Sequence, residues 1–458
     1  IANNIVEKLT MMGVWASAGS AGPFHTNVVI ENNLVRDVHG IDELDYGFGL
    51  YVQGTTGRVE GNRVSDCRNA IQIQPYGAVG PEAVCRNNMF SGYRLGVWYN
   101  YAQNGNTPWL LTNNQVAAST APAGTFVAYW QGISVYVQRA GAGGVQVTGN
   151  QIDGSVALAD PAHAVWGGMV TPVMGLHYGP HTSVATNVLF TNNTVTGTAY
   201  GYVQESPAAM ALAGNTFSVT RDAIRLQGPW TAAGEGAQGG TADIDATGGN
   251  IVNGVDTASA SLDEQFRIED IVRHGLDKDG LGLVRVKAGE VFVTDPATAH
   301  YASAEPSTDS DIQRGVTKAV AGDVVNVEDG LYLQSNTQIG KALTLLGQSR
   351  AGVVIAPAGE DDNVDSAFGG VYHHGLMIAA HDVKVSNLTV NGQANSALTP
   401  GKNNFRMGIC TLDASLPGGG SWNNLHVDGV TVTHIWRRGI SLFPTSITGT
   451  LIENCLVD

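Results

Sequence analysis

The chain has 458 residues, of which 59 are glycine and only 14% are charged, and its formal net charge is -16 at pH 7. Such an acidic chain repels the phosphate backbone of nucleic acids, so we expect no nucleic-acid partner. No apolar stretch is long enough to cross a bilayer, so we expect no membrane span. Abundant Gly and Asn favour turns and strands over helical bundles.

One short pattern recurs through the first half of the chain: alternating apolar residues lead into an asparagine, and another apolar residue follows. Strict alternation is typical of a strand with one buried face. Asparagine suits the following turn, because its side chain tolerates the left-handed region and can bond its own backbone. We therefore expect these landmark asparagines to build turns and to align into a ladder where repeats stack. They are Asn33, Asn62, Asn88, Asn114, Asn150, Asn193 and Asn215.

A second apolar run lies between successive landmarks, as in FGLYV at residues 48–52 and MGLHY at 174–178. The landmarks lie 22 residues apart from Asn193 to Asn215 and 43 apart from Asn150 to Asn193. This spacing fits one coil of a solenoid plus loops of variable length. The sequence therefore predicts an all-β solenoid, with a first segment over residues 1–256 that starts inside a coil.

Residues 257–306 break this pattern and are predicted to form a small α/β connector. Leu262, Phe266 and the pair Ile271–Val272 recur at loosely helical spacing, which indicates a short helix. The runs LGLVRV and EVFVT follow and are joined by residues 287–289 in the manner of a hairpin.

Residues 307–458 are predicted to form a second segment that opens with a capping helix and ends inside a coil. A Ser/Thr/Asp cap precedes Ile312, Val316 and Val320, which share one helical face, and Gly322 marks the end of the helix. Short apolar runs then return as coil strands, from VVNV to RGISLF.

The helix at residue 312, followed by AGDVVNVEDGLY and LTLLG, resembles the start of pectate-lyase-like domains in bacterial exported proteins. The resemblance extends over most of the chain outside residues 257–303. It implies a right-handed parallel β-helix and an extracellular or cell-surface location. It implies no single activity, because this superfamily includes lyases, hydrolases, epimerases, adhesins and phage spikes. None of the catalytic sets of its enzymes matches this sequence residue by residue.

Written head to tail, the two ends of the chain align without a gap on the coil that begins at Ile30. Ile452 falls on Ile30, and Ile5 falls on Ile41. This offset predicts a junction, which would arise from a tandem array, from head-to-tail stacking of copies or from circular permutation. Open coil ends expose unpaired strand edges, so further copies of the chain are the expected partners.

Charged residues precede the second strand of several coils and form a candidate charged column. Asp42, Glu43 and Asp45 precede FGLYV, and Arg437 and Arg438 precede GISLF. If the chain is an enzyme, these are its predicted catalytic residues, because carboxylates beside arginines can carry out acid/base chemistry on a sugar. The alternative is a solvated ladder of ion pairs.

Aromatic residues in or just beyond the second strands form a candidate ligand-binding face. Aromatic rings stack on sugars, but they also occur at protein interfaces and between coils. Together with two arginines of the charged column, the predicted binding residues are Trp15, Tyr51, Tyr76, Trp98, Tyr99, Arg68 and Arg94. Tyr136 and Tyr178 continue the same run of aromatic residues.

Two acidic runs resemble fragments of calcium loops, although the full EF-hand spacing is absent. Ca²⁺ is therefore assigned at most a stabilising role, with Asp277, Asp279, Asp361 and Asp362 as its ligands. His177 and His181 are close enough in sequence for a metal pair but have no third ligand, so ordinary loop histidines are the alternative. The four cysteines lack metal or disulfide spacing and are expected to be buried free thiols.

Two functions remain open from the sequence. The open coil ends and the missing catalytic sets favour an extracellular structural or adhesive protein, assembled head to tail or as a tandem-repeat array into a filament or matrix. The charged column favours instead a polysaccharide lyase or glycoside hydrolase acting on anionic polysaccharide.

Overall fold

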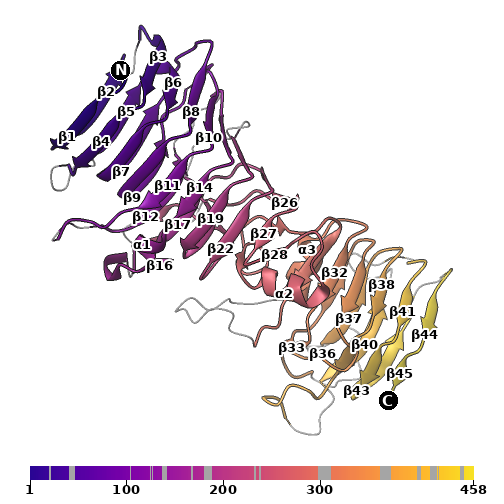
Figure 1. The fold of residues 1–458 in the computed structure, drawn as a ribbon. Coiled ribbons are helices and arrows are strands. Elements are labelled where there is room, and N and C mark those ends of the chain that lie inside the picture. The colour runs from indigo at the N-terminus through magenta and orange to yellow at the C-terminus, as the bar shows by residue number, and fades with distance from the viewer. Residues whose placement is uncertain are drawn as a thin grey trace. The chain divides into compact units, whose positions relative to one another are not determined.

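A computed structural model shows an all-β chain made of parallel sheets (Figure 1). It describes residues 1–19, 22–40, 47–103, 105–123, 125, 127–136, 142–163, 165–166, 169–179, 188–231, 234–236, 239–297, 311–361, 373–399, 404–412, 420, 422–443 and 448–458. The chain forms two compact units. The first comprises Ile1–Ala260, Ile271–His274 and Gly280–Val286, and the second comprises Ser261–Asp270, Gly275–Asp279 and Lys287–Asp458.

The first unit contains a nine-stranded sheet in which each strand pairs in parallel with the next one along the chain. Its strands are β3 (His25–Glu31), β6 (Thr55–Glu60), β8 (Ala83–Arg86), β10 (Trp109–Thr112), β13 (Val145–Thr148), β18 (Val188–Thr191), β21 (Met210–Ala213), β26 (Ile244–Gly248) and β30 (Val284–Arg285).

A 17-stranded sheet, which we call the large sheet, completes the first unit in two rows that share the long strands β7 (Arg63–Gln74) and β9 (Met89–Tyr99). The first row adds β1 (Ile5–Leu9), β4 (Leu34–Val38), β11 (Gln115–Ala118), β14 (Gln151–Asp153), β19 (Thr194–Thr198), β22 (Thr216–Val219), β27 (Ile251–Val252) and the antiparallel β28 (Val255–Asp256). The second row adds β2 (Met12–Ser17), β5 (Phe48–Gln53), β12 (Trp130–Val135), β17 (Val173–Tyr178), β20 (Tyr200–Gln204), β23 (Ile224–Leu226) and β29 (Val272–Arg273).

Short elements lie in the connections of the first unit. They are the helices α1 (Ser155–Leu158) and η1 (Pro161–His163) and the antiparallel pairs β15 (Val165–Trp166) with β16 (Met169–Val170) and β24 (Trp230–Thr231) with β25 (Gly234–Glu235).

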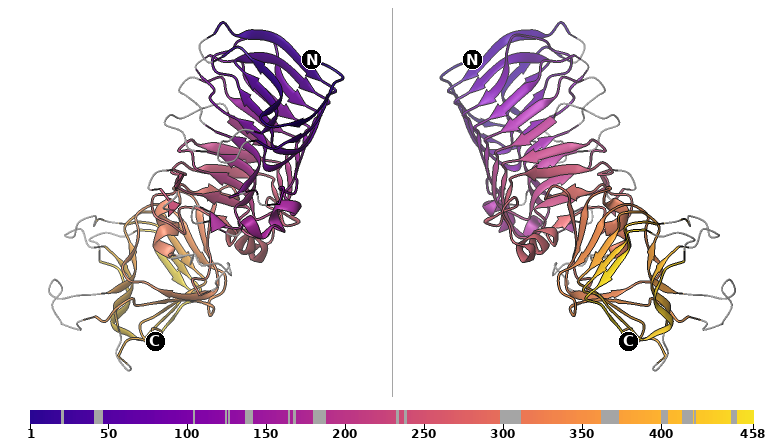
Figure 2. Two further views of the ribbon diagram at one scale, coloured as in Figure 1. Left: turned by 90° about the vertical axis from the view of Figure 1, so that its left-hand side faces the viewer. Right: turned by 90° about the vertical axis from the view of Figure 1, so that its right-hand side faces the viewer.

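The second unit repeats this plan with three parallel sheets, whose strands lie side by side within the unit in Figure 2. The six-stranded sheet has β31 (Glu290–Val293), β32 (Val324–Val327), β35 (Thr344–Gly347), β38 (Lys384–Ser386), β41 (His426–Asp428) and β44 (Leu451–Glu453). The five-stranded sheet has β33 (Gly330–Leu333), β36 (Val353–Ala356), β39 (Thr389–Asn391), β42 (Thr431–Thr433) and β45 (Leu456–Val457). The four-stranded sheet has β34 (Thr337–Ile339), β37 (His374–Ile378), β40 (Phe405–Thr411) and β43 (Ile435–Ser441).

Two helices belong to the second unit. Helix α2 (Leu262–Glu269) begins with a capping box between Ser261 and Glu264. Helix α3 (Ile312–Lys318) begins at the cap Asp311 and buries Ile312 and Val316, which confirms a helix here, but it ends before Val320, which is exposed.

We call each stretch of chain that contributes one strand to each sheet or row a rung. The core of the first unit consists of alternate strand residues such as Val97, Ile133 and Leu176, which are fully buried and paired across successive rungs. A glycine precedes many of these positions. A Cβ atom on Gly132 would lie 2.7 Å from the carbonyl oxygen of Gly175 in the next rung and 2.4 Å from Ile152, so only glycine allows this close packing.

The landmark asparagines form the predicted ladder, and it is longer than the sequence indicated. Each amide Nδ2 donates to the Oδ1 of the asparagine in the next rung, over 2.9 to 3.2 Å. Each Oδ1 also accepts the backbone N–H of the preceding asparagine, and from Asn62 onward Nδ2 donates to a buried strand carbonyl as well. Asn4 and Asn250 extend the ladder at its two ends.

The predicted reason for these asparagines was wrong in one respect. The left-handed residue is the one before each landmark, for example Asn32 at φ 55° before Asn33, and Gly61 at φ 65° before Asn62. The landmark asparagine itself lies inside the turn, where its amide bonds groups that have no access to water. Asparagine is therefore required at these positions for the hydrogen bonds of its amide inside the turn, and not for a left-handed backbone.

The described part of the second unit keeps this turn without an asparagine ladder. The left-handed residues Asn387 and Gly429 follow β38 and β41. The positions after them are held by Leu388 and Val430, which are fully buried. Asn454 is likewise the left-handed residue, at φ 53°, so it precedes the ladder position instead of filling it.

The predicted connector hairpin is wrong. Strand β30 pairs in parallel with β26 of the first unit, and β31 pairs in parallel with β32 of the second unit. Each unit thus takes one of the two apolar runs into its own sheet, because a parallel ladder with a neighbouring rung satisfies more backbone groups than an isolated hairpin.

The gapless junction of the chain ends is also wrong. Ile5 pairs with Leu34, and Asn4 bonds Asn33, so the first residues repeat the turn at Asn32 instead of following it. The last strands, β44 and β45, flank the equivalent turn at Asn454. Both ends therefore carry the same part of a rung. Association between copies stays a prediction, which the alignment of the chain ends no longer supports.

All four cysteines are free, with Cys67, Cys85 and Cys410 buried and Cys455 half-buried. Among the described residues, none of the helices has the length and apolar character needed to cross a membrane.

We predict that Asn114→Ala lowers the free energy of unfolding of the first unit by about 2 to 4 kcal/mol, because it removes from the core the donor to Cys85 O and the acceptor for the backbone N–H and the side-chain amide of Asn88. Urea unfolding followed by circular dichroism measures this change. The matched control is Asn113→Gly, which alters the left-handed neighbour and should change stability by less than about 1 kcal/mol. Equal effects of the two variants would contradict the ladder account.

Candidate functional site

The second row of the large sheet aligns one residue of each rung into a column on the face opposite the core. Leu50, Ile71 and Val97 point inward and are fully buried, so their strand neighbours point outward. In register, the column consists of Trp15, Tyr51, Gln72, Trp98, Ser134, His177, Val203, Arg225 and Arg273. Neighbouring members are separated by one strand spacing, about 4.8 Å.

Aromatic rings form a continuous row along the first half of this face. Trp15 and Tyr51 have centroids 6.2 Å apart, Tyr51 and Phe48 5.4 Å, Phe48 and Trp98 6.2 Å, and Trp98 and Tyr136 6.4 Å. We call these five residues the aromatic row. The Trp15 side chain is 60% exposed, Trp98 and Tyr136 are half-buried, and the rings between them are buried. The row therefore offers separated ring surfaces to solvent.

Amide side chains hold further rings beside the row. Gln74 Oε1 accepts from the hydroxyls of Tyr51 at 2.7 Å and Tyr76 at 3.2 Å, and from Gln53 Nε2 at 3.2 Å. The ring of Tyr76 stacks on that of Tyr101 at 6.2 Å. These contacts place hydroxyl and amide groups next to ring faces, which is the mixture that a sugar ring requires.

A chain of six buried polar residues continues from the end of the aromatic row. It consists of Ser134, His177, Glu205, Gln227, Arg225 and Asp222, and we call it the polar chain. Ser134 Oγ lies 2.9 Å from His177 Nδ1, and His177 Nε2 lies 3.6 Å from Glu205 Oε2. Gln227 donates to Glu205 at 3.0 Å, Arg225 donates to Gln227 at 2.6 Å, and Arg225 pairs with Asp222 at 3.0 Å. His177 joins the two arrays, because the Tyr136 ring lies 6.2 Å from its own ring.

The phenol of Tyr136 remains protonated over a wide pH range. Burial raises its pKa, and the negative charge of Glu205 raises it further. Nearby, Arg94 donates to the Tyr129 hydroxyl at 2.8 Å and covers the Tyr129 ring at 4.9 Å. The junction of row and chain thus combines the protonated Tyr136 phenol with the buried carboxyl group of Glu205.

The structure separates the predicted binding residues into two groups. Trp15, Tyr51, Tyr76 and Trp98 lie on or beside the outer face described above. Tyr99 does not, because its side chain is fully buried and its hydroxyl donates to Gly144 O at 3.1 Å; its ring is not available to a ligand. Tyr178 is buried in the same way. Arg68 is only 9% exposed, and Arg94 is engaged with Tyr129.

The predicted catalytic residues are not assembled into a site by the described part of the chain. Asp42, Glu43 and Asp45 lie outside the described residues. Arg437 and Arg438 belong to β43 of the second unit, where the Arg438 guanidinium lies 5.3 Å from the Phe443 ring.

Arginine side chains lie beside some of the residues that were predicted to bind Ca²⁺. Arg314 pairs with Asp279 at 3.2 Å and donates to Asp277 O at 3.3 Å, and the Asp279 side chain is otherwise 88% exposed. Asp361 is buried, lies 3.8 Å from Arg406 and accepts the His373 N–H at 2.9 Å, while Asp362 lies outside the described residues. A guanidinium group therefore lies beside Asp279 and Asp361, and Ca²⁺ binding by the predicted ligands stays a prediction.

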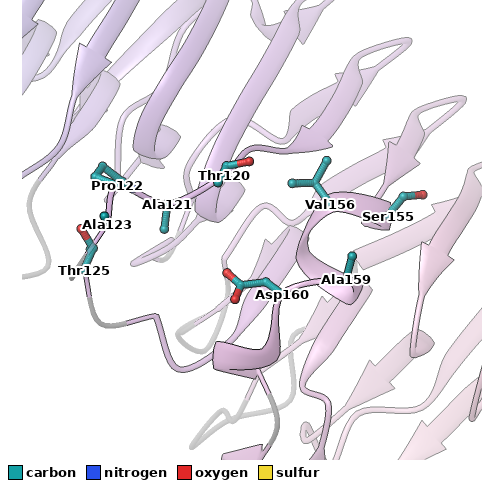
Figure 3. Close-up of a pocket in the computed structure, with 9 residues that line it drawn as sticks. All are labelled: Thr120, Ala121, Pro122, Ala123, Thr125, Ser155, Val156, Ala159 and Asp160. Atoms are coloured by element: carbon teal, nitrogen blue, oxygen red, sulfur yellow. The ribbon is translucent and has the colours of Figure 1, made fainter.

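A separate cavity of about 710 Å³ lies between the segment after β11 and helix α1 (Figure 3). Its lining consists of Thr120, Ala121, Pro122, Ala123, Thr125, Ser155, Val156, Ala159 and Asp160. Asp160 Oδ2 lies 3.8 Å from Nδ1 of the buried His163, whose pKa is lowered by burial. Among the described residues, this lining has no aromatic face and no arginine or lysine, so they match a carbohydrate less well than the aromatic row does.

Comparison with protein-family models gives no match, and comparison with curated proteins gives none either. Among solved structures, the chain is similar to a mutant of AlyGC, a PL6 family alginate lyase. The two share 11% identity at a TM-score of 0.25, over 98% of this chain and 77% of that one. A similarity this low carries no argument about activity.

Sequence reasoning missed most of the polar chain. His177 was considered only as a partner for His181, and Glu205, Gln227 and Arg225 were not singled out. The available signal was register: the runs MGLHY and AIRLQ can be aligned with FGLYV on their buried apolar residues. That alignment would have placed His177 and Arg225 in the column of Tyr51 and Trp98.

The buried pair of Asp361 and Arg406 generates a prediction through its neighbour His374. Burial, assisted by the charge of Arg406, lowers the pKa of His374 to about 4. In the unfolded chain this imidazole titrates at about 6.5, so below that pH only the unfolded state takes up the proton. The contribution of His374 to the stability of the second unit is therefore fully present above about pH 6.5 and is lost as the pH falls toward 4.

We expect the wild-type chain to lose about 2 kcal/mol more stability between pH 7.5 and pH 5 than the variant His374→Gln. Urea unfolding at both pH values measures the difference. His434→Gln, which removes an exposed histidine of the same unit, should behave like the wild type. Equal losses in the wild type and His374→Gln would refute the assignment.

Proposed function

We propose that each unit is a right-handed parallel β-helix of the pectate-lyase-like kind. Two features support this fold. Every rung pairs in parallel with the next in the same sheet order, and crossover connections between parallel strands are almost always right-handed. The ladder also stacks equivalent residues from one rung to the next, which is the behaviour of a solenoid.

We further propose that the protein binds polysaccharide along the aromatic row. The observation that carries this proposal is the continuity of the row: Trp98 lies three rungs from Trp15, Tyr136 lies one rung beyond Trp98, and all three rings reach solvent. Ring faces at such intervals suit a ligand that is itself extended and repetitive, while the amides of Gln53 and Gln74 suit sugar hydroxyls.

The burial of the polar chain favours binding over catalysis. Ser134 is fully buried and His177 is 2% exposed, so the partly exposed rings present more contact surface than the groups capable of proton transfer. An extracellular or cell-surface protein with an adhesive or structural role follows from this proposal, because extended polysaccharides are abundant there. We also keep the assembly of copies into a filament or matrix as part of this proposal. The strand register at the two chain ends does not support this part.

We predict that Trp98→Ala and Tyr136→Ala each weaken polysaccharide binding by about tenfold or more, because each removes a stacking surface that the row presents to solvent. Affinity electrophoresis against a panel of neutral and anionic polysaccharides identifies the ligand, and calorimetry with its oligosaccharides gives the change in Kd.

Trp422→Ala is the matched control, since Trp422 is also a half-buried tryptophan but lies in the second unit beside His381. It should leave binding unchanged. Failure of the wild type to bind any polysaccharide of the panel, or equal weakening by all three substitutions, would refute the proposal.

A polysaccharide lyase acting on anionic polysaccharide is the second candidate, and the contact between Tyr136, His177 and Glu205 favours it. In a β-elimination, a base removes the proton next to the uronate carboxyl group, the bond to the glycosidic oxygen breaks, and an acid protonates that oxygen. A neutral His177 can accept the proton, with Glu205 stabilising the imidazolium that forms, and the Tyr136 phenol can supply the proton to the leaving oxygen.

For this candidate we expect unsaturated sugar ends, detected by absorbance near the ultraviolet band of a conjugated carboxylate, to appear with anionic polysaccharides. His177→Gln should then reduce the rate by at least about a hundredfold while Kd stays within a few-fold. Binding without any product from a broad uronate panel would leave the adhesive function as the only one of the two.

A further inference from the structure

Three metal-ligating side chains meet on the outer face of the six-stranded sheet in the second unit, apart from the residues of the proposed binding face. His426 and Asp428 lie in β41, and Val427 between them is fully buried, so strand alternation places both on the outer face. Glu453 lies in the adjacent strand β44, where it pairs with Asp428. Two neighbouring parallel strands thus present an imidazole and two carboxylates at one place.

The geometry of this group is close to what a bound cation requires. One ligand atom from each residue lies within 4.8 Å of the other two, and His426 Nε2 lies 3.0 Å from Glu453 Oε1. Asn454 Nδ2 donates to Asp428 Oδ1 at 3.0 Å, which orients the Asp428 carboxylate and leaves Oδ2 for another partner. A cation about 2.1 Å from each ligand atom needs these atoms about 3.4 Å apart, which a rotation of the half-exposed Glu453 side chain provides.

We propose that His426, Asp428 and Glu453 bind a divalent transition-metal ion such as Zn²⁺ or Mn²⁺. An imidazole with two carboxylates is a donor set for such ions, whereas Ca²⁺ prefers six or more oxygen ligands. The exposure of the group leaves the remaining coordination positions open to water or to a ligand from solution.

One neighbouring charge gives the proposal a distinctive signature. Lys384 Nζ lies 3.8 Å from Asp428 Oδ2, and Lys384 pairs with His426 in the strand register. A metal ion and the lysine compete for the same carboxylate oxygen. Removal of this positive charge therefore strengthens metal binding, whereas removal of a ligand weakens it.

The test is isothermal titration of the full chain, purified without a histidine tag and stripped with chelator, with Zn²⁺ and then Ca²⁺. We expect one Zn²⁺ site in the second unit and no displacement of Zn²⁺ by millimolar Ca²⁺. Glu453→Gln and His426→Gln should weaken Zn²⁺ binding by about tenfold or more, and Lys384→Gln should strengthen it by about threefold.

His434→Gln is the matched control, because it removes an exposed histidine that follows β42, a strand of the five-stranded sheet, and should leave the Kd unchanged. The thermal unfolding of each stripped variant shows that a loss of binding is not a loss of fold. Zn²⁺ binding that persists in Glu453→Gln and His426→Gln, or that weakens in Lys384→Gln, would overturn the proposal. Both results are independent of polysaccharide binding.

Discussion

The turn between the two sheets of each rung creates buried polar groups that no water can reach, and the first unit satisfies them with asparagine. A single primary amide offers two donors and one carbonyl oxygen that can accept twice. In the turn at Asn114 these groups bond Cys85 O, the amide of Asn150, and the backbone and side chain of Asn88. Each amide supplies hydrogen-bond partners that the asparagine in the next rung needs. The stacking of rungs and the burial of the turns therefore depend on one another.

This stacking explains how residues distant in sequence form a continuous surface. Once the ladder sets the register, positions such as Trp98, Ser134 and His177 are in adjacent strands although loops of different length separate them. The aromatic row and the polar chain are consequences of this register. The loops therefore have freedom in length and composition, while the outer face of the strands stays in place.

The second unit solves the same problem with apolar packing. Leu388 and Val430 fill the ladder position, and the turn before each uses a left-handed residue as the first unit does. The group that we propose to bind a metal ion in this unit depends on strand register, as the aromatic row does. Asp428 and Glu453 are paired across neighbouring strands. Similar rungs thus present different functional side chains in the two units, because residues that point outward do not have to fit the packing of the core.

The sequence by itself determined the strand content, the ladder of asparagines and the helix at Ile312, because alternation, turn chemistry and capping act within a few residues of one another. Only the tertiary structure decided which strands pair and which side chains meet. The separation of β30 from β31, the burial of Tyr99 and the contact of His177 with Glu205 depend on neighbours from other rungs, at sequence distances that loop length obscures. Register, a long-range property, placed the surface that we propose to be functional.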